Sequence, residues 1–318
     1  MIELSARRID VHAHYFGGSV AALARTHGLP PAIAARPWTP EDALAAMDRH
    51  EVATQVLSVP FTATSEGQRA GFARTLCRRI NEELAGLIDQ YPGRFRAFAC
   101  LPGDGPEAML DELAYALDVL RLDGVSLTSN VAGRYLGAPV LDSVLAELDR
   151  RRAPVYIHPA ACAHAAELSL GRHASLLEFP FDTARTITDA LYCGVFLRHR
   201  GLRLILSHLG GALPALAWRI AACTTVSAGP GDALVTAEHV AEVLRGLYYD
   251  TAMAGSPHSL LPVLQVTGID HILFGTDVGA APEPIIAGAI GELTCALSGP
   301  DLEAVECSNA ARLFPRLA

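Results

Sequence analysis

The sequence predicts an α/β fold in which parallel strands form a barrel with helices outside it, and three observations predict this fold. Short apolar runs rich in β-branched residues recur along all 318 residues. Stretches with helical periodicity separate these runs, and each is long enough for a crossover connection. The runs are nearly continuously apolar, as expected for strands with both faces buried. Strand then helix, repeated eight times, is the pattern of a (β/α)8 TIM barrel.

Eight segments are expected to form the barrel strands. In chain order they are RIDVHAH ending at His14, TQVLSV ending at Val59, FRAFACL ending at Leu101, GVSLTS ending at Ser129, PVYIHP ending at Pro159, RLILSH ending at His208, LYYDTA ending at Ala252 and HILFGTD ending at Asp277. The clearest helical periodicity between them lies in residues 40–50, 70–90, 106–122, 138–151 and 183–198.

Two segments depart from the simple repeat of strand and helix. Residues 15–39 contain Gly17, Gly18 and two adjacent prolines, and they are too long for a plain loop. We expect this long loop after the first strand to cover the mouth of the barrel. From Pro282 onward we expect extra C-terminal helices packed against the outside. Since no internal repeat, low-complexity tract or linker is apparent, residues 1–318 are expected to form a single domain.

Composition excludes several classes of function. The formal net charge is -9, so there is no basic excess to bind a phosphate backbone, and a nucleic-acid partner is not expected. All 25 basic residues are arginine. The absence of lysine excludes a Schiff-base lysine, a phosphate-loop lysine and a lysine carbamate that bridges two metal ions.

The cysteines and the N-terminal residues bear on location. Seven cysteines are scattered without a CxxC pair, which favours buried free thiols in a reducing compartment over disulfides or a thiolate metal site. The opening MIELSARRIDVHAH lacks the apolar run of a signal peptide, and no apolar stretch reaches membrane-spanning length. We therefore expect a cytoplasmic protein without a membrane segment.

Histidine and aspartate gather at the expected strand ends. His12 and His14 are two residues apart, so a strand directs both side chains to the same face. His158, His208 and Asp277 end three further strands, and active sites of barrels lie at the C-terminal strand ends. Imidazole nitrogens with a carboxylate suit zinc or another divalent ion such as manganese.

A structural role must be weighed against this metal site. A single histidine at a strand end is more often a structural or surface residue, and we place the eight others in that class: His27, His50, His164, His173, His199, His239, His258 and His271. Asp250 could support a metal ligand, but capping of the next loop is its expected role. A catalytically silent barrel kept for binding is a further alternative. However, five ligand-type residues at the ends of four strands favour a metal centre over chance.

Several motifs resemble a known family. DVHAH, YIHP, ILSHLGG, YYDTA, LFGTD and the closing SNAARLF resemble the amidohydrolase superfamily, and in particular its decarboxylase branch related to aminocarboxymuconate semialdehyde decarboxylase. The resemblance spans essentially the whole chain. Within that branch, DGVSLTSN, YLG, ELDRRRAPVYIHP and FPFDTARTI look most like the 6-methylsalicylate decarboxylases and their relatives.

The resemblance implies roles for individual residues. His12, His14, His158 and Asp277 would bind one divalent metal ion, usually zinc and alternatively manganese, and His208 would be an active-site histidine that does not bind it. Arg219 resembles the arginine that such decarboxylases reach across a dimer interface to the substrate carboxylate, which implies a homodimer. An ion pair at an interface or surface is an equally good interpretation of Arg219.

Arg185 is a second, weaker candidate for substrate binding, because on an amphipathic helix it could simply be solvated.

The leading functional hypothesis is non-oxidative decarboxylation of an aromatic acid resembling an ortho-hydroxybenzoate, or of an unsaturated acid. The ion would orient the small carboxylic acid substrate and act as a Lewis acid, and an acid beside it must protonate the carbon that loses carbon dioxide. Asp277, or water on the ion managed by His208, could supply that proton. The alternative is hydrolysis of a lactone, amide or ester at the same mononuclear site.

Overall fold

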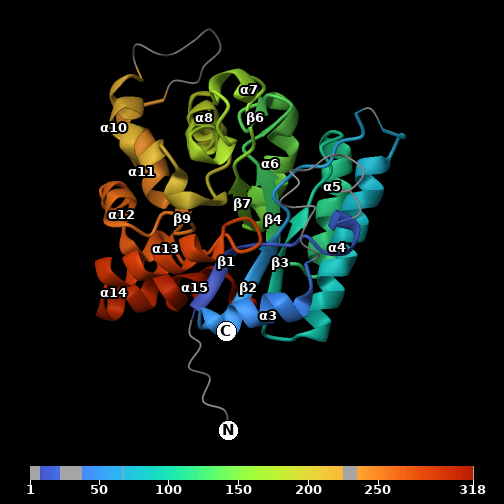
Figure 1. Ribbon diagram of the computed structural model, residues 1–318. Coiled ribbons are helices and arrows are strands. Elements are labelled where there is room, and N and C mark those ends of the chain that lie inside the picture. Colours follow the sequence, from blue (N-terminus) through green and yellow to red (C-terminus); the bar gives the residue numbers. More distant parts are fainter. Residues whose placement is uncertain (1–7, 22–37, 67, 225–234, 318) are drawn as a thin grey trace.

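The computed structural model describes residues 8–21, 38–66, 68–224 and 235–317. In these ranges eight strands form one sheet in the order β1-β2-β3-β4-β7-β8-β9-β10, and every pair of neighbours in this order is parallel. The strands are β1 (Arg8–His14), β2 (Val52–Ser58), β3 (Phe95–Cys100), β4 (Gly124–Thr128), β7 (Pro154–His158), β8 (Arg203–Leu206), β9 (Tyr248–Asp250) and β10 (Ile272–Leu273). The expected (β/α)8 barrel is confirmed (Figure 1).

Backbone hydrogen bonds between β1 and the residues that follow β10 close the barrel. The Val11 amide donates to the Phe274 carbonyl at 2.9 Å, and the Asp277 amide donates to the His12 carbonyl at 2.8 Å. The sequence predicts an eighth strand that runs to Asp277, but β10 ends at Leu273. The residues that follow still bond to β1, up to the His14 amide, which donates to the Val278 carbonyl at 2.9 Å.

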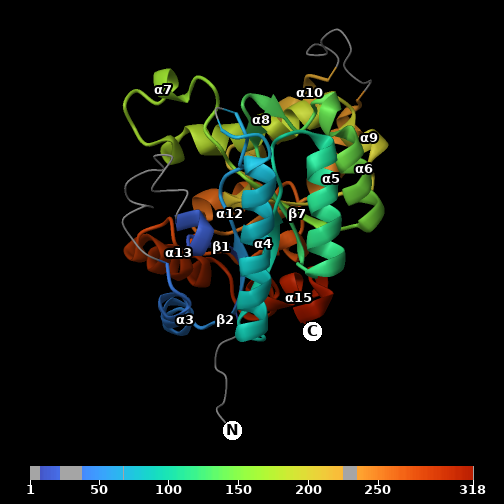
Figure 2. The ribbon, with the colours of Figure 1, turned by 90° about the vertical axis from the view of Figure 1, so that its right-hand side faces the viewer.

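Helices pack around the outside of the barrel (Figures 1 and 2). They are α3 (Pro40–Arg49), α4 (Phe72–Gln90), α5 (Pro106–Ala114), α6 (Asp142–Arg151), α7 (Ala165–Leu168), α8 (Glu178–Tyr192), α9 (Val195–Arg198), α10 (Leu213–Ala222), α11 (Ala237–Gly246), α12 (Pro257–Leu264), α13 (Glu283–Ala296), α14 (Gly299–Glu303) and α15 (Asn309–Leu313). C-terminal helices are present as expected, in α13, α14 and α15, but the end of α15 packs into the inner core cluster and not against the outside. The long loop after the first strand lies largely in residues 22–37, outside the described residues.

Local chemistry explains where several helices begin and end. Thr39 caps α3 by accepting the amide of Asp42 at 3.1 Å, and proline occupies the first turn. The single helix expected over residues 183–198 is instead two helices, because Gly194 adopts a left-handed conformation with φ 70° between α8 and α9. A short hairpin of β5 (Asn130–Val131) and β6 (Arg134–Tyr135), which was not expected, follows β4.

The core has an inner and an outer layer. The inner layer fills the bore and includes Phe98, Tyr156 and Ile205. Leu313 and Phe314, at the end of α15, pack into the same cluster. The larger outer layer lies between the strands and the helices. Helix α15 lies at the amino end of the barrel (Figure 1), and its end fills the bore there, so chemistry is expected at the carboxyl end.

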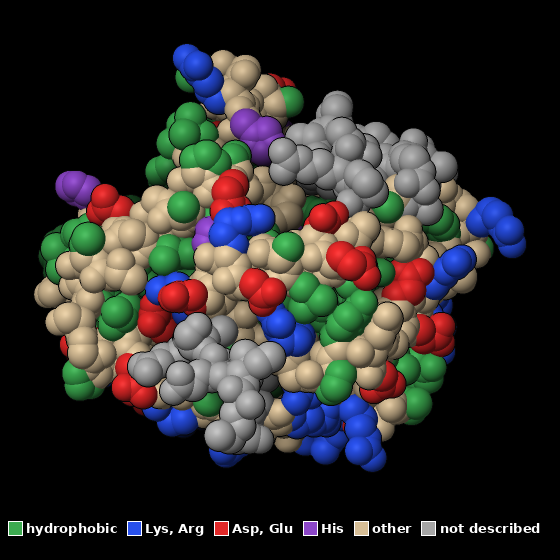
Figure 3. Space-filling model, turned by 60° about the horizontal axis from the view of Figure 1, so that its bottom comes forward, with side chains coloured by type: hydrophobic (Ala, Val, Ile, Leu, Met, Phe, Trp, Pro, Cys, Tyr) green, Lys and Arg blue, Asp and Glu red, His purple; other side chains and the backbone are tan. Residues whose placement is uncertain are grey.

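The surface charges, the hydropathy of the helices and the exposure of the cysteines bear on the expectations from the sequence. Acidic and basic side chains are intermingled on the face shown in Figure 3. Among the described residues, none of the helices is both long and apolar enough to cross a lipid bilayer. All seven cysteines are free, as expected, but only Cys77 and Cys100 are buried, and Cys295 is exposed. The expectation of buried thiols therefore holds for two of the seven positions.

Candidate metal centre

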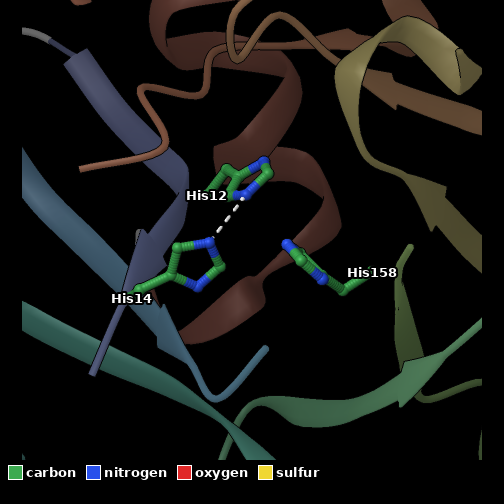
Figure 4. A group of neighbouring side chains, drawn as sticks. All are labelled: His12, His14 and His158. Atoms are coloured by element: carbon green, nitrogen blue, oxygen red, sulfur yellow. Dashed lines mark hydrogen bonds between the residues drawn. The ribbon is translucent and has the colours of Figure 1, made fainter. Parts of the chain in front are cut away.

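Three histidine side chains converge at the carboxyl end of the bore. His12 and His14 come from β1 and His158 from the end of β7, and the three rings face one another (Figure 4). One ligand nitrogen of each lies within 4.8 Å of the others. The Nε2 atoms of His12 and His14 are 3.2 Å apart. The exposed fraction of each side chain is 5% or less, so the group is shielded from solvent.

The backbone of β1 is irregular at this point. Its register against β2 shifts between Asp10 and Ala13, which is the signature of a β-bulge. Val11 packs in the inner cluster with Tyr156, and the adjacent His12 ring also contacts Tyr156, with centroids 5.3 Å apart. Two consecutive residues therefore face the bore, and His14 follows on the same side as His12.

Asp277 and His208 complete the group. Asp277 Oδ1 lies 2.9 Å from His14 Nε2 and 3.2 Å from His12 Nε2, whereas His208 Nε2 lies 3.7 Å from Asp277 Oδ2. His12, His208 and Asp277 form a second set of ligand atoms within 4.8 Å. Both His208 and Asp277 have positive φ, 55° and 63°. Such backbone strain at a side chain facing a site is typical of functional positions.

Burial and neighbouring charges set the protonation of this group. Burial lowers the pKa of His14, and it takes that of His158 well below its usual range. Burial also opposes charge on Asp277 and on His12, but at each residue the attraction of the opposite charges nearby outweighs this effect of burial. The pKa of Asp277 is held well below its usual range, and Asp250 together with Asp277 raises that of His12 to about 10. In the ion-free protein a proton on His12 thus occupies the place that a cation would take.

One carboxylate links two members of the site from behind. Asp250, at the end of β9, has Oδ2 3.1 Å from His12 Nδ1 and accepts the Tyr156 hydroxyl at 3.1 Å. Its Oδ1 accepts the backbone amides of His208 at 3.1 Å and Ala252 at 3.0 Å. The expected loop cap is therefore present, but the same side chain also orients the His12 ring. Sequence reasoning left this second contact aside, because nothing local links residues 12 and 250.

A second buried aspartate braces the seam between the first and last strands. Asp10 accepts the amide of His12 at 3.0 Å and the hydroxyl of Thr276 at 2.6 Å, and Gln55 donates to it at 3.3 Å. Thr276 directly precedes Asp277. The bonds of Asp10 thus fix the backbone next to two members of the site, a function that sequence reasoning did not assign to it.

The donor set fits a divalent cation. Asp277 Oδ1 is buried and has no hydrogen-bond partner among the described residues, although two imidazole nitrogens lie within 3.2 Å of it. Lone pairs held this close repel one another unless a proton or a cation lies between them. Neutral imidazoles and an ionised carboxylate are ligands that zinc and manganese accept. The residues present therefore fit the expected single ion.

The two arginines lie elsewhere. Arg219, on α10, is exposed, and no ion pair to it is found among the described residues. Arg185, on α8, donates to the buried carboxylate of Asp182 at 2.5 Å. Asp182 also accepts a hydrogen bond from the hydroxyl of Ser129, and that hydroxyl accepts one from the backbone amide of Ala160. Substrate binding by either arginine stays a prediction, and the contacts of Arg185 are those of a structural ion pair.

Comparison with known proteins identifies the family. The model of the amidohydrolase family matches residues 9–316. Decarboxylase macB of Penicillium terrestre is 35% identical over 97% of this chain and 95% of its own length. The 6-methylsalicylic acid decarboxylase acuB of Aspergillus aculeatus is 33% identical, over 98% of this chain and 96% of its own.

A solved structure shares the fold. Dihydroxybenzoic acid decarboxylase from Polaromonas sp. JS666, with bound manganese and the inhibitor 2-nitroresorcinol, superposes with a TM-score of 0.81 at 24% identity, over 97% of each chain. The family expected from DVHAH and the other motifs is thus confirmed, and the chain belongs to the amidohydrolase family.

Proposed function

We propose that this protein is a metal-dependent decarboxylase of aromatic acids with a hydroxyl group ortho to the carboxylate. The observation that carries the proposal is the cluster of His12, His14, His158 and Asp277, four donor side chains from three separated parts of the barrel, in which His12 and His14 lie close both to His158 and to Asp277. Whole-length similarity to proteins named as decarboxylases favours this reaction over hydrolysis at the same kind of site.

These four residues would hold one divalent ion. When bound, the ion would coordinate the carboxylate and the neighbouring oxygen of the acid and withdraw charge from them. The buried neutral imidazoles of His14 and His158 leave lone pairs available for it, and the Asp277 carboxylate offsets part of its charge. We propose zinc as the ion. Manganese is the alternative, and it is the ion in the Polaromonas enzyme.

The chain must also deliver a proton to the ring carbon that loses carbon dioxide. Asp277 is held in its ionised form by the histidines around it, which makes it a poor proton store in the ion-free site. His208 Nε2 lies 3.7 Å from Asp277 Oδ2, and its side chain is 17% exposed, so it can exchange protons with solvent. We therefore assign the proton transfer to His208, with Asp277 as its anionic partner.

The test measures the products of the metal-loaded enzyme. It is incubated with salicylate-type acids and, separately, with lactones, while carbon dioxide release and ring opening are followed. Carbon dioxide from the hydroxy acids alone supports the proposal. Ring opening without gas would replace it with the hydrolase, and His158→Ala serves as the control for reactions that do not need the site.

Two further features belong to the proposal. A homodimer would allow Arg219, which is exposed and unpaired within the described part of its own chain, to contact the acid bound by a partner subunit. A cytoplasmic location would suit seven cysteines that are all free, including Cys77 and Cys100, whose sulfur atoms lie 3.4 Å apart.

A further inference from the structure

A cavity of about 280 Å³ lies beside the metal centre, over the carboxyl ends of β2, β3 and β4. Residues of the loops after β2 and β3, of β4, of the β5–β6 hairpin and of α5 line it, with Val140 and Leu141 from the turn before α6. None of the five residues of the metal centre lines it. An apolar cavity of about 150 Å³ holds a benzene molecule. The space therefore suffices for a substituted aromatic ring.

Thr128 lies between the cavity and the metal centre. It lines the cavity, and it pairs in register with His158 on the neighbouring strand. Neighbouring strands lie about 4.8 Å apart, so residues paired in register are adjacent. The cavity is thus separate from the histidine cluster but directly adjoins it.

Two hydroxyl groups of this wall, those of Thr62 and Thr128, are arranged in one direction. Thr128 donates its only hydroxyl proton to the carbonyl of Asn130 at 2.9 Å. The hydroxyl oxygens of Thr62 and Thr128 are 2.7 Å apart, so Thr62 must be the donor in that bond. Both protons are then used, and Thr62 offers only lone pairs to a molecule in the cavity. A ligand that donates a hydrogen bond, such as a phenol, matches this pair of hydroxyl groups, whereas a carboxylate does not.

The charges around the cavity point the same way. Glu66 and Asp104 line it, against one cation, Arg134. Asp104 accepts the amide of Ser65 at 2.7 Å and its hydroxyl at 2.5 Å, which fixes its carboxylate in place. The remaining wall is largely apolar, including Met109 and Leu127. An anionic acid is disfavoured by this surplus of negative charge, and a neutral ring is not.

We propose that this cavity is a binding site for a neutral phenol, separate from the metal centre. Decarboxylation of a hydroxybenzoate removes the carboxylate and leaves the ring with its hydroxyl donor, so the ligand is the product of the reaction. That identification rests on the proposed function, whereas the preference for a phenol rests on the cavity itself. A phenol held there would occupy a site next to the centre and inhibit the enzyme without competing with the acid.

Gly103 offers a way to test the cavity without altering the metal centre. A Cβ at this position would lie 2.9 Å from Thr64 Cγ2, 3.0 Å from Thr62 Cγ2 and 3.1 Å from Val131 Cγ1. Gly103→Ala therefore displaces three side chains that line the cavity. Thr62→Val removes the hydroxyl acceptor at nearly constant volume. Thr75→Val is the matched control, because Thr75 is exposed on α4 and lies outside the cavity.

The probe is 3-methylphenol, titrated by calorimetry into the metal-loaded protein, with 6-methylsalicylate in a parallel titration. We expect saturable binding of the phenol, about fivefold weaker in Thr62→Val, the factor that one lost hydrogen bond of about 1 kcal/mol gives. Gly103→Ala weakens binding further, and Thr75→Val leaves it unchanged. His158→Ala, which disrupts the metal centre, keeps phenol binding but loses that of the acid.

Several results would overturn the site. The first is the absence of saturable phenol binding. The second is loss of phenol binding in His158→Ala together with normal binding in Thr62→Val. The third is purely competitive inhibition by the phenol against the acid. If the cavity variants weaken phenol binding but no acid releases carbon dioxide, the phenol site stands and the proposed function alone fails. If carbon dioxide is released but the cavity variants bind phenol normally, the site fails alone.

Discussion

His12 Nδ1 lies 3.1 Å from Asp250 Oδ2, and both side chains are fully buried. The residues are 238 positions apart in the chain and come from the first and seventh strands of the barrel. Since a carboxylate accepts hydrogen bonds, Asp250 holds the proton of a neutral His12 ring on Nδ1. The Nε2 lone pair is then directed at His14, His158 and Asp277, where a cation would bind.

Asp250→Asn is expected to weaken metal binding by about 10- to 100-fold, the usual effect of removing such a partner. The amide oxygen can still accept the amides of His208 and Ala252, which places its NH2 group toward His12 Nδ1. That contact favours the His12 tautomer protonated on Nε2. In this tautomer Nε2 has no free lone pair with which to bind an ion. Competition with a chromogenic chelator measures the affinity.

Asp189→Asn is the matched control for that variant. Asp189 accepts the amide of Gly137 at 2.8 Å and has no histidine partner among the described residues. Its substitution should leave metal affinity unchanged. Equal affinity in Asp250→Asn and the wild type would show that the aspartate only caps its loop.

His208→Ala is expected to keep about one equivalent of metal and to lose turnover by about 10²- to 10⁴-fold, the usual contribution of general acid–base catalysis. His158→Ala is expected to lose both, because His158 belongs to the buried group of three histidines. Elemental analysis after dialysis and carbon dioxide release measure the two properties. Equal metal loss in the two variants would make His208 a ligand.

The sequence carries enough information for the barrel and for the positions of its polar residues. Local periodicity predicts that His12 and His14, two residues apart, lie on the same face of a strand. The ends of the predicted strands give the positions of His158 and Asp277. All of these residues meet in the structure. Periodicity suffices here because a parallel barrel places every carboxyl strand end at one rim.

Contacts set by tertiary geometry are not visible in the same pattern. The bulge at Val11 and His12, the Asp250 contact and the cavity behind Thr128 depend on register between strands that are distant in sequence. The hairpin after β4 was missed because each of its strands, β5 and β6, has only two residues and no periodicity to detect. Such features determine selectivity, which is why the sequence predicts a reaction class better than a ligand.

Removal of the ion is expected to destabilise the folded protein. A ligand at 100 times its Kd stabilises the native state by about 2.7 kcal/mol, provided that the unfolded chain does not bind it. Urea unfolding of metal-loaded and chelator-treated protein measures the difference in the free energy of unfolding. In His158→Ala the two curves should nearly coincide. If the chelator left the free energy of unfolding of the wild type unchanged, that result would contradict a buried metal centre.

Cys77 is expected to resist alkylation in the folded protein. The hydrogen bond to Cys100 and burial raise the pKa of the Cys77 thiol well above its usual range, so it stays protonated. Iodoacetamide at pH 8, followed by mass spectrometry, should label the exposed Cys295 and spare Cys77 until urea is added. Because only the unfolded chain ionises this thiol near pH 9, its contribution to stability decreases as the pH rises above that value.

The proposed dimer and the role of Arg219 can be tested together. Arg219→Ala should raise the KM for the acid and leave the metal content unchanged. Arg185→Ala should leave KM unchanged, because its partner Asp182 keeps hydrogen bonds from Ser129, Asn130 and Tyr135.

Mixing Arg219→Ala with the inactive His208→Ala gives the sharper result. In a mixed dimer, the subunit that carries Arg219→Ala retains its own His208 and receives Arg219 from its partner. One site in two is then complete, so random exchange of subunits should restore about a quarter of wild-type activity. If the arginine serves its own subunit, no mixed dimer contains a complete site and the mixture stays as slow as its parents. If sedimentation showed that the protein is a monomer, the proposal that Arg219 acts in the partner subunit would be wrong.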